Sequence, residues 1–160
     1  MSETIRRAIP DDATDITEMI HALADFERAA DQCSVTEDRI LTALFGEPPT
    51  LHGLVADVDG EIAAMALWFL NFSTWDGVAG IHLEDLFVRP GFRRRGLARA
   101  LLAELAGECL TKGYTRLSWA VLNWNSDAIA LYEGVGGEPQ REWTTYRLSG
   151  ARLAELAGPP

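Results

Sequence analysis

Six adjacent residues form the most chemically distinctive stretch of the chain: Arg93, Arg94, Arg95, Gly96, Leu97 and Ala98. An apolar run ends just before them and an amphipathic run follows, which predicts a strand, a tight turn and the first turn of a helix. The first amides of a helix have no partner inside the helix and carry partial positive charge, so they bind phosphate readily. Gly96 has no Cβ, and a ligand can therefore approach the backbone closely. The stretch predicts an anion-binding turn suited to a diphosphate.

Two glycine motifs of nucleotide-binding proteins fit this stretch less well. The chain has no Gly-x-x-x-x-Gly-Lys-Ser/Thr motif for a nucleotide P-loop, and no Gly-x-Gly-x-x-Gly motif that opens a helix. The simple alternative is a solvated basic turn between a strand and a helix. The rest of the chain has to decide between an anion site and such a turn.

Two adjacent carboxylates, Glu84 and Asp85, lie in the apolar run at residues 83–88. A carboxylate that faces a cleft can bind an amine or accept its proton. Neighbouring side chains on a strand point to opposite faces, but a β-bulge changes this, and bulges often lie beside active sites. The alternative is that one carboxylate only solvates the strand.

A further pair, Asn125 and Tyr132, is seven residues apart in a predicted helix, and the two side chains can point the same way. The tyrosine hydroxyl could protonate a thiolate, although a core tyrosine with its hydroxyl at the surface is the more common arrangement. His21, His52 and His82 share no metal-ligand spacing, so we expect structural or surface roles and no metal site.

Composition narrows the class of protein. The chain has 160 residues, 48% of them hydrophobic, which suits one domain over residues 1–160. There is no bilayer-spanning apolar run and no signal-peptide core, and Cys33 and Cys109 form no Cys-x-x-Cys pattern, so we expect a cytoplasmic protein without disulfides. The net charge of −10 argues against nucleic acid and is compatible with a cationic substrate.

Hydrophobic periodicity predicts the elements that position these residues. We expect strands at residues 4–9, 51–57, 61–69, 81–88, 117–122 and 143–148, a helix carrying the apolar positions 16–26, a second helix opened at Ser34 and running to 45, helices at 96–112 and 126–135, and a short amphipathic tail at 151–156. Asp11 or Asp12 should cap the first helix, and a capping box of Ser34 and Glu37 should open the second. Asp59-Gly60 predicts a tight hairpin. The strand–helix–strand order around residues 93–113 predicts a parallel crossover.

Several motifs together resemble one family. Arg93-x-x-Gly96-x-Ala98 resembles the Arg/Gln-x-x-Gly-x-Gly/Ala signature of the GNAT acetyltransferase superfamily. Four further segments look like its diamine (spermidine/spermine) acetyltransferase branch: Phe26-Glu27, Phe72 to Trp75, Leu83 to Val88, and Asn123 to Asn125 with Tyr132 following. Trp143-x-x-Tyr146-Arg147-Leu148 looks like the thialysine acetyltransferase-like members. The match covers nearly the whole chain, but the loop at residues 74–80 differs in length from the diamine enzymes, and Ala98 stands where many members have glycine.

This resemblance implies an α/β GNAT acyl-CoA N-acyltransferase fold. Its mixed, mostly antiparallel central sheet is flanked by helices, and a splayed parallel strand pair holds acetyl-CoA. The implied reaction is acetyl transfer from acetyl-CoA by direct attack of a small primary amine: a polyamine, thialysine or a lysine-like amino acid. No metal takes part, and members are commonly homodimers. The alternatives are a protein or peptide N-acetyltransferase and a non-catalytic acyl-CoA-binding sensor.

The resemblance also implies roles for individual residues. Backbone groups of Leu86, Phe87 and Val88 should bind the pantetheine arm, residues 93–98 should hold the pyrophosphate, and Asn125 should hydrogen-bond to coenzyme A. Tyr132 should be the general acid, and Glu84 should receive the proton of the amine through water. The amine pocket should be lined by Glu27, Trp75, Glu84 and Asp85, with part of it contributed by a partner subunit.

Overall fold

The computed structural model describes residues 2–160, which divide into two compact units, one up to Ser126 and one from Asp127 to Pro160. The first unit holds β1 (Glu3–Arg7), α1 (Ala13–Phe26), α2 (Glu37–Phe45), β2 (His52–Val58), β3 (Glu61–Ser73), β4 (Val78–Val88), α3 (Leu97–Lys112) and β5 (Leu117–Ser118). Nearly all of α4 (Ser126–Gly134) and the whole of α5 (Ala151–Ala157) belong to the second unit. A single domain over residues 1–160 stays a prediction.

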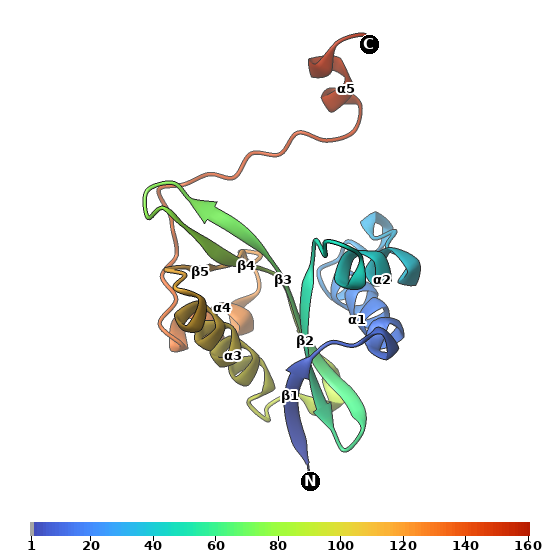
Figure 1. The fold of residues 1–160 in the computed structure, drawn as a ribbon, viewed down its shortest axis with the longest axis vertical. Coiled ribbons are helices and arrows are strands. Elements are labelled where there is room, and N and C mark those ends of the chain that lie inside the picture. Colours follow the sequence, from blue (N-terminus) through green and yellow to red (C-terminus); the bar gives the residue numbers. More distant parts are fainter. Residues whose placement is uncertain (1) are drawn as a thin grey trace. The chain divides into compact units, whose positions relative to one another are not determined.

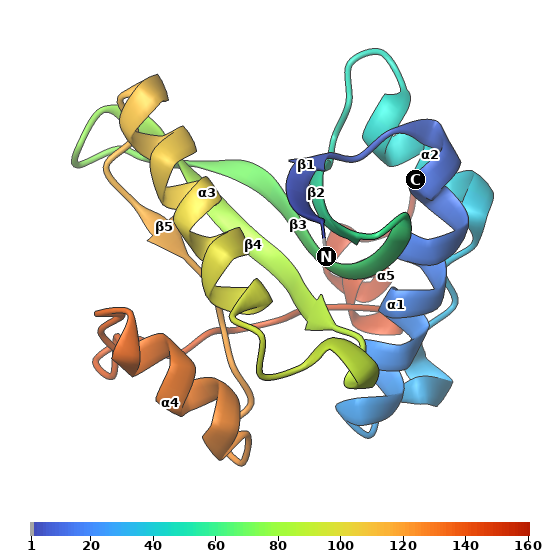
Figure 2. The same ribbon diagram turned by 90° about the horizontal axis from the view of Figure 1, so that it is seen from below.

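The five strands of the first unit form one sheet in the order β1-β2-β3-β4-β5. The first three pairings are antiparallel, and β4 pairs with β5 in parallel across the α3 crossover. α1 and α2 lie on one face of the sheet and α3 lies on the other (Figures 1 and 2). The predicted mixed sheet flanked by helices is therefore confirmed.

The core between the sheet and the first two helices fixes the position of α1. It contains Ile16, Met19, Ile40, Leu44, Val55, Ile62, Met65, Leu67 and Phe87. Full burial of such a side chain contributes about 1.5–3 kcal/mol. Because Leu67 and Phe87 come from the strands that carry the candidate site, this core also holds those strands against α1.

The two hairpins differ in how well the sequence predicts them. At the β2–β3 turn, Asp59 and Gly60 have φ angles of 54° and 87°, both left-handed, as the Asp-Gly pair predicts. The β3–β4 hairpin continues five residues beyond β2 to Ser73, where the sequence predicts a polar connection. Leu70 and Phe72 are 45% and 63% exposed, so pairing with β4, and not burial of an apolar face, holds this extension.

Two predicted helix caps differ from the structure. Asp12 is the N-cap residue of α1, as predicted, but its carboxylate makes no capping hydrogen bond; it accepts hydrogen bonds from Arg6 at 2.8 and 3.0 Å and from the Ile9 N–H at 2.8 Å. The cap of α2 is Thr36, whose hydroxyl accepts from the Arg39 N–H, and not Ser34. At α1 other partners bind the predicted carboxylate, and at α2 a nearer hydroxyl reaches the free amide.

The end of the chain also departs from the prediction. β5 covers only two of the six residues predicted as a strand, and residues 143–148 form no strand within the second unit. In the described part of the chain, the backbone N–H groups of residues 144–149 donate to no backbone carbonyl. Over the same described residues, no helix is both long enough and apolar enough to cross a membrane.

Candidate active site

The loop between β4 and α3 has the backbone of an anion site. We call residues 93–98 the arginine loop. Arg94 and Gly96 have φ angles of 63° and 78°, and such left-handed residues turn successive N–H groups toward one side. The first helical hydrogen bond runs from the Ala100 N–H to the Gly96 carbonyl at 2.9 Å, so the N–H groups of Leu97 and Ala98 have no acceptor within α3. No side chain of residues 2–160 caps this end.

Two arginines anchor the loop to its surroundings. The Arg93 Nε donates to the Val88 carbonyl at 3.1 Å, and its guanidinium lies 5.6 Å from the ring of Phe26. Arg89 donates to Asp15 at 2.6 Å and to Glu18 at 3.2 Å, which joins the end of β4 to α1. Arg93, Arg94 and Arg95 all stay exposed, so their charges remain available to an anionic ligand.

Beside the arginine loop, β4 and β5 separate. Their only pairs are Ile81 with Leu117 and His82 with Ser118. Beyond residue 82, the edge of β4 that faces β5 therefore has no strand partner among the described residues. Backbone groups of residues 86–88 that point away from β3 can bind an extended, amide-containing chain along this edge, as an added strand would.

A β-bulge lies on β4 at the two adjacent carboxylates. Leu67 on β3 is opposite Asp85, and Trp68 is opposite Leu83, so Glu84 is the extra residue. Residues directly opposite each other share a face of the sheet. Because Leu67 belongs to the core under α1, Asp85 lies on the α1 face, together with His82, which is opposite Phe69 two residues further along β3. Without the bulge, residues 82 and 85 would lie on opposite faces.

Two neighbouring carboxylates act on Asp85 at this bulge. Burial, and then the charges of Glu84 and Glu27, raise the pKa of Asp85 to about 6. Glu27 follows the last residue of α1, and burial raises its pKa as well. The structure thus brings together three of the four predicted amine-pocket residues, and a bound cation would relieve their mutual repulsion.

The bulge also gathers two residues to which the sequence analysis assigned no site role. The His82 Nδ1 lies 3.3 Å from the Ser118 Oγ, and its Nε2 lies 3.8 Å from the Glu84 Oε2. The His82 ring packs on Phe69 with centroids 4.9 Å apart. Spacing could have found His82, because it lies two residues before Glu84 on a predicted strand, whereas the position of Ser118 depends on the strand pairing.

The remaining predicted residues lie elsewhere. Trp75 is in the β3–β4 turn and is 85% exposed, away from the core. Asn125 is half-buried at the end of the first unit, next to Trp124, whose ring lies 5.8 Å from that of Phe26 on α1. Tyr132 is half-buried in α4 of the second unit. Their predicted roles stay predictions.

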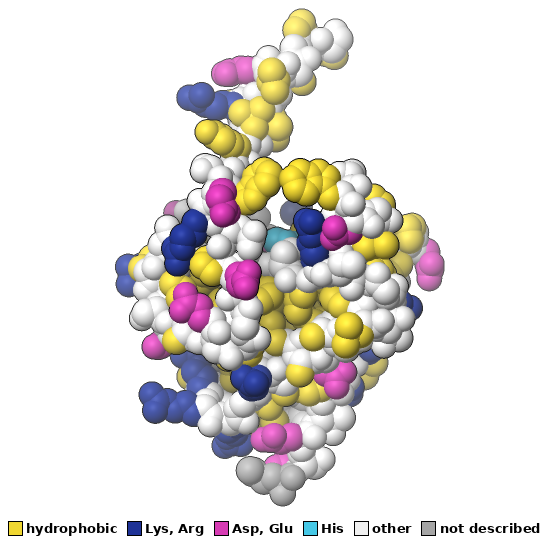
Figure 3. Space-filling view, turned by 90° about the vertical axis from the view of Figure 1, so that its left-hand side faces the viewer, with side chains coloured by type: hydrophobic (Ala, Val, Ile, Leu, Met, Phe, Trp, Pro, Cys, Tyr) yellow, Lys and Arg dark blue, Asp and Glu magenta, His cyan; other side chains and the backbone are white. Residues whose placement is uncertain are grey.

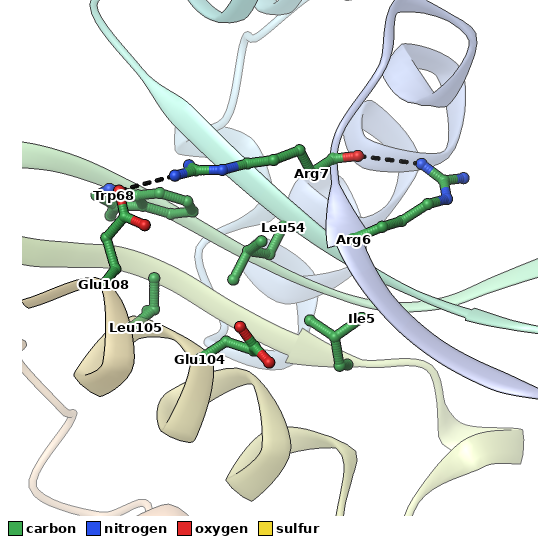
Figure 4. Close-up of a pocket in the computed structure, with 8 residues that line it drawn as sticks. All are labelled: Ile5, Arg6, Arg7, Leu54, Trp68, Glu104, Leu105 and Glu108. Atoms are coloured by element: carbon green, nitrogen blue, oxygen red, sulfur yellow. Dashed lines mark hydrogen bonds and ion pairs between the residues drawn. The ribbon is translucent and has the colours of Figure 1, made fainter. Parts of the chain in front are cut away.

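A separate cavity of about 230 Å³ lies between the sheet and α3 (Figure 4). The Arg7–Glu108 ion pair of 2.8 Å closes one end of it, and the Arg7 guanidinium lies 4.8 Å from the centre of the Trp68 ring. This cavity contains none of the predicted site residues. Figure 3 shows one face of the molecule, on which Lys and Arg side chains lie among acidic, polar and apolar ones. In residues 2–160 there is no group of three metal-ligating side chains.

Comparison with known proteins agrees with this geometry. The model of the acetyltransferase (GNAT) family matches residues 16–136. The thialysine N-epsilon-acetyltransferase of Caenorhabditis elegans is 40% identical over 151 residues, which cover 92% of each chain. The enzyme of the same name from Bos taurus is 34% identical over 165 residues, 96% of each chain. A solved integron cassette protein from the mobile metagenome of V. cholerae has a TM-score of 0.82 at 24% identity, over 98% of both chains.

Proposed function

The chain belongs to the acetyltransferase (GNAT) family and is an N-acetyltransferase, and we propose that it acetylates the terminal amine of a small basic amino acid of the thialysine type. The observation that carries the proposal is the group of carboxylates at the β4 bulge, next to the open edge of β4 and the arginine loop. The two relatives named for thialysine, similar over more than nine-tenths of the chain, support this acceptor.

The cosubstrate side of the site is formed by the arginine loop and β4. The free N–H groups at the start of α3 and the three arginines fit a pyrophosphate, and the open edge at Leu86, Phe87 and Val88 fits the amides of a pantetheine arm. Asn125 adds a hydrogen bond to coenzyme A. When bound, acetyl-CoA supplies an activated thioester, so the protein has only to position the amine and manage its protons.

The amine side of the site is formed by carboxylates. Glu27 and Asp85 attract the ammonium group, Trp75 covers the entrance, and Glu84 accepts the proton of the amine through water. This step is required because an ammonium group, with a pKa near ~10.4, has no lone pair with which to attack. Tyr132 then protonates the leaving thiolate. Transfer is direct, without an acyl-enzyme.

We further propose that the enzyme is a homodimer in the cytoplasm. Trp143 and Tyr146 are 72% and 92% exposed in a segment that forms no strand within its own unit, and such aromatic side chains are enriched at interfaces. Cys33 and Cys109 are both free, as thiols are in a reducing compartment. Sedimentation of the purified chain tests the dimer: a monomer at micromolar concentration would contradict it.

The central test measures thiol release from acetyl-CoA with a panel of amines: thialysine, lysine, putrescine, spermidine and a mixed peptide pool. We expect the highest kcat/KM with thialysine. Tyr132→Phe should lower kcat by about 10²- to 10⁴-fold, as expected for loss of a general acid, with coenzyme A affinity unchanged. Tyr114→Phe, another half-buried tyrosine, is the matched control and should keep wild-type turnover.

The remaining results of this assay identify the alternative functions. Turnover of the peptide pool alone would make the chain a peptide N-acetyltransferase. Coenzyme A binding without turnover of any amine would make it an acyl-CoA sensor. Thiol release that does not respond to Tyr132→Phe would remove Tyr132 from the role of acid.

A further inference from the structure

The proposed reaction releases one proton for every amine that it acetylates. An ammonium substrate and acetyl-CoA give an amide, free coenzyme A and one proton. Two protons leave the nitrogen: one ends on the sulfur of coenzyme A, and the other has to reach solvent. Glu84 accepts the latter in the proposed mechanism, and it must lose that proton before the next turnover.

The geometry points to His82 as the group that takes this proton from Glu84; this inference rests on the proposed function. The His82 Nε2 is 3.8 Å from the Glu84 Oε2, a gap that one water molecule or a small side-chain rotation closes. The His82 and Glu84 side chains are 30% and 55% exposed, so both reach solvent, and the imidazole beside Glu84 can release the proton there. The relay thus runs from the ammonium group to Glu84, then to His82, then to water.

Three strands hold the imidazole in position for this transfer. On one side the Ser118 Oγ lies 3.3 Å from Nδ1, and on the other the Phe69 ring packs against the imidazole. We assign the ring proton to Nδ1, where it donates to Ser118, because Nε2 then presents its lone pair to Glu84. Nε2 becomes protonated as Glu84 loses its proton, so no other reactant is needed.

The surroundings of the ring make Glu84 its specific partner. β3 contributes the uncharged Phe69, β5 contributes the uncharged Ser118, and on β4 itself Glu84 is the charged group that faces the ring. Asp85 lies on the same face of the sheet as His82, opposite Leu67, two residues from the Phe69 that is opposite His82. His82 and Ser118 are also the last pair before β4 and β5 separate, which places the relay at the inner end of the open edge.

The test uses His82→Gln and His82→Ala with the amine that the wild-type enzyme turns over. His82→Gln keeps a group that can hydrogen-bond to Ser118 but cannot carry a proton. We expect kcat to fall about 10- to 100-fold in both variants. Added imidazole should restore turnover in His82→Ala, and the rescue should increase with pH as the added imidazole loses its proton. A role in packing alone would not respond to the protonation state of a small base.

His52→Gln is the matched control. His52 also packs on an aromatic residue of β3, with ring centroids 5.7 Å from Trp68, but it forms no ion pair with a carboxylate among residues 2–160. It should keep wild-type kcat and show no response to imidazole. Coenzyme A binding and thermal melting, measured for every variant, verify that each one is folded.

The outcomes separate the relay from the proposed function. If the wild-type enzyme releases no thiol with any amine, the proposed function fails before His82 is tested. If the wild-type enzyme is active and His82→Gln matches it in kcat and in the acid limb of its pH–rate profile, the relay is wrong. If the His82→Ala variant is folded and slow but does not respond to added imidazole, the relay is likewise wrong and His82 has a packing role.

Discussion

Asp85 shows that a single half-buried side chain can make folding and function compete. Its pKa of about 6 in the folded protein is above the value of about 3.9 expected in the unfolded chain. Between these two values the folded state binds a proton that the unfolded state has released. Stability from this residue is therefore complete below pH ~4 and is lost as the pH rises through about 6. A bound ammonium group offsets that loss of stability, so the unfavourable charge of Asp85 in the free enzyme favours substrate binding.

Asp85→Asn should therefore have opposite effects on stability and on activity. The amide is nearly isosteric and has no charge, so Tm should rise relative to the wild type at pH 7.5, with a smaller difference at pH 4. The kcat/KM for the amine should fall at least about ten-fold, because a charge-assisted contact is worth about 1.5–3 kcal/mol. Thermal melts at both pH values and steady-state kinetics measure the two effects.

Asp31→Asn, at an exposed position, is the control and should change neither stability nor activity. A lower Tm for Asp85→Asn at pH 7.5 would show that hydrogen bonding of the carboxylate outweighs its repulsion.

At the scale of elements, the arginine loop and α3 offer a matched pair of glycines. Gly96 has a φ of 78°, where a side chain costs about 1–2 kcal/mol, and it is where a ligand would approach the backbone. Gly107 is in the exposed interior of α3 with open space around it, where alanine gains about 0.5–1 kcal/mol. Gly96→Ala should thus lower Tm and weaken coenzyme A binding at least about ten-fold, while Gly107→Ala should raise Tm and leave binding unchanged. Calorimetric titration with coenzyme A decides the comparison. Unchanged affinity in Gly96→Ala would remove this glycine from the pyrophosphate site.

Some features of these elements can be predicted from the local sequence, whereas others depend on which segments contact each other. The Asp59-Gly60 turn, α3 with its left-handed Gly113, and the strand before the arginine loop all follow from short patterns, and the structure confirms them. The capping bond predicted at Asp12 is wrong because Arg6, six residues earlier in β1, binds the carboxylate instead. Similarly, the bulge at Glu84 is settled only by the register of β3 with β4, so the sequence could name the carboxylates and the spacing of His82 but could not place His82 and Asp85 on one face of the sheet.

The whole molecule adds a long-range field to these local arrangements. The net charge of −10 attracts a cationic acceptor, and the strength of attraction increases with the charge of the acceptor. In the described part of the chain, the carboxylates at the bulge contribute to this field at the point where the amine is expected to bind. Salt screens this long-range field, with a Debye length of about 10 Å at 0.1 M and about 3 Å at 1 M. Attraction by the field is therefore more sensitive to salt than recognition by direct contact.

Salt should therefore weaken the binding of different amines to different degrees. Putrescine carries two positive charges and thialysine a net single charge, so raising potassium chloride from 20 to 500 mM (our chosen range, spanning Debye lengths from roughly 20 to 4 Å) should raise the KM of putrescine more steeply. Each KM is measured at saturating acetyl-CoA, so that salt effects on the arginine loop do not enter. The kcat values serve as the internal control and should change little, because the proton transfers occur over a few ångströms within the site. Equal salt dependence for the two amines would mean that the net charge does not guide the substrate, and recognition would then rest on Glu27, Glu84 and Asp85 at contact distance.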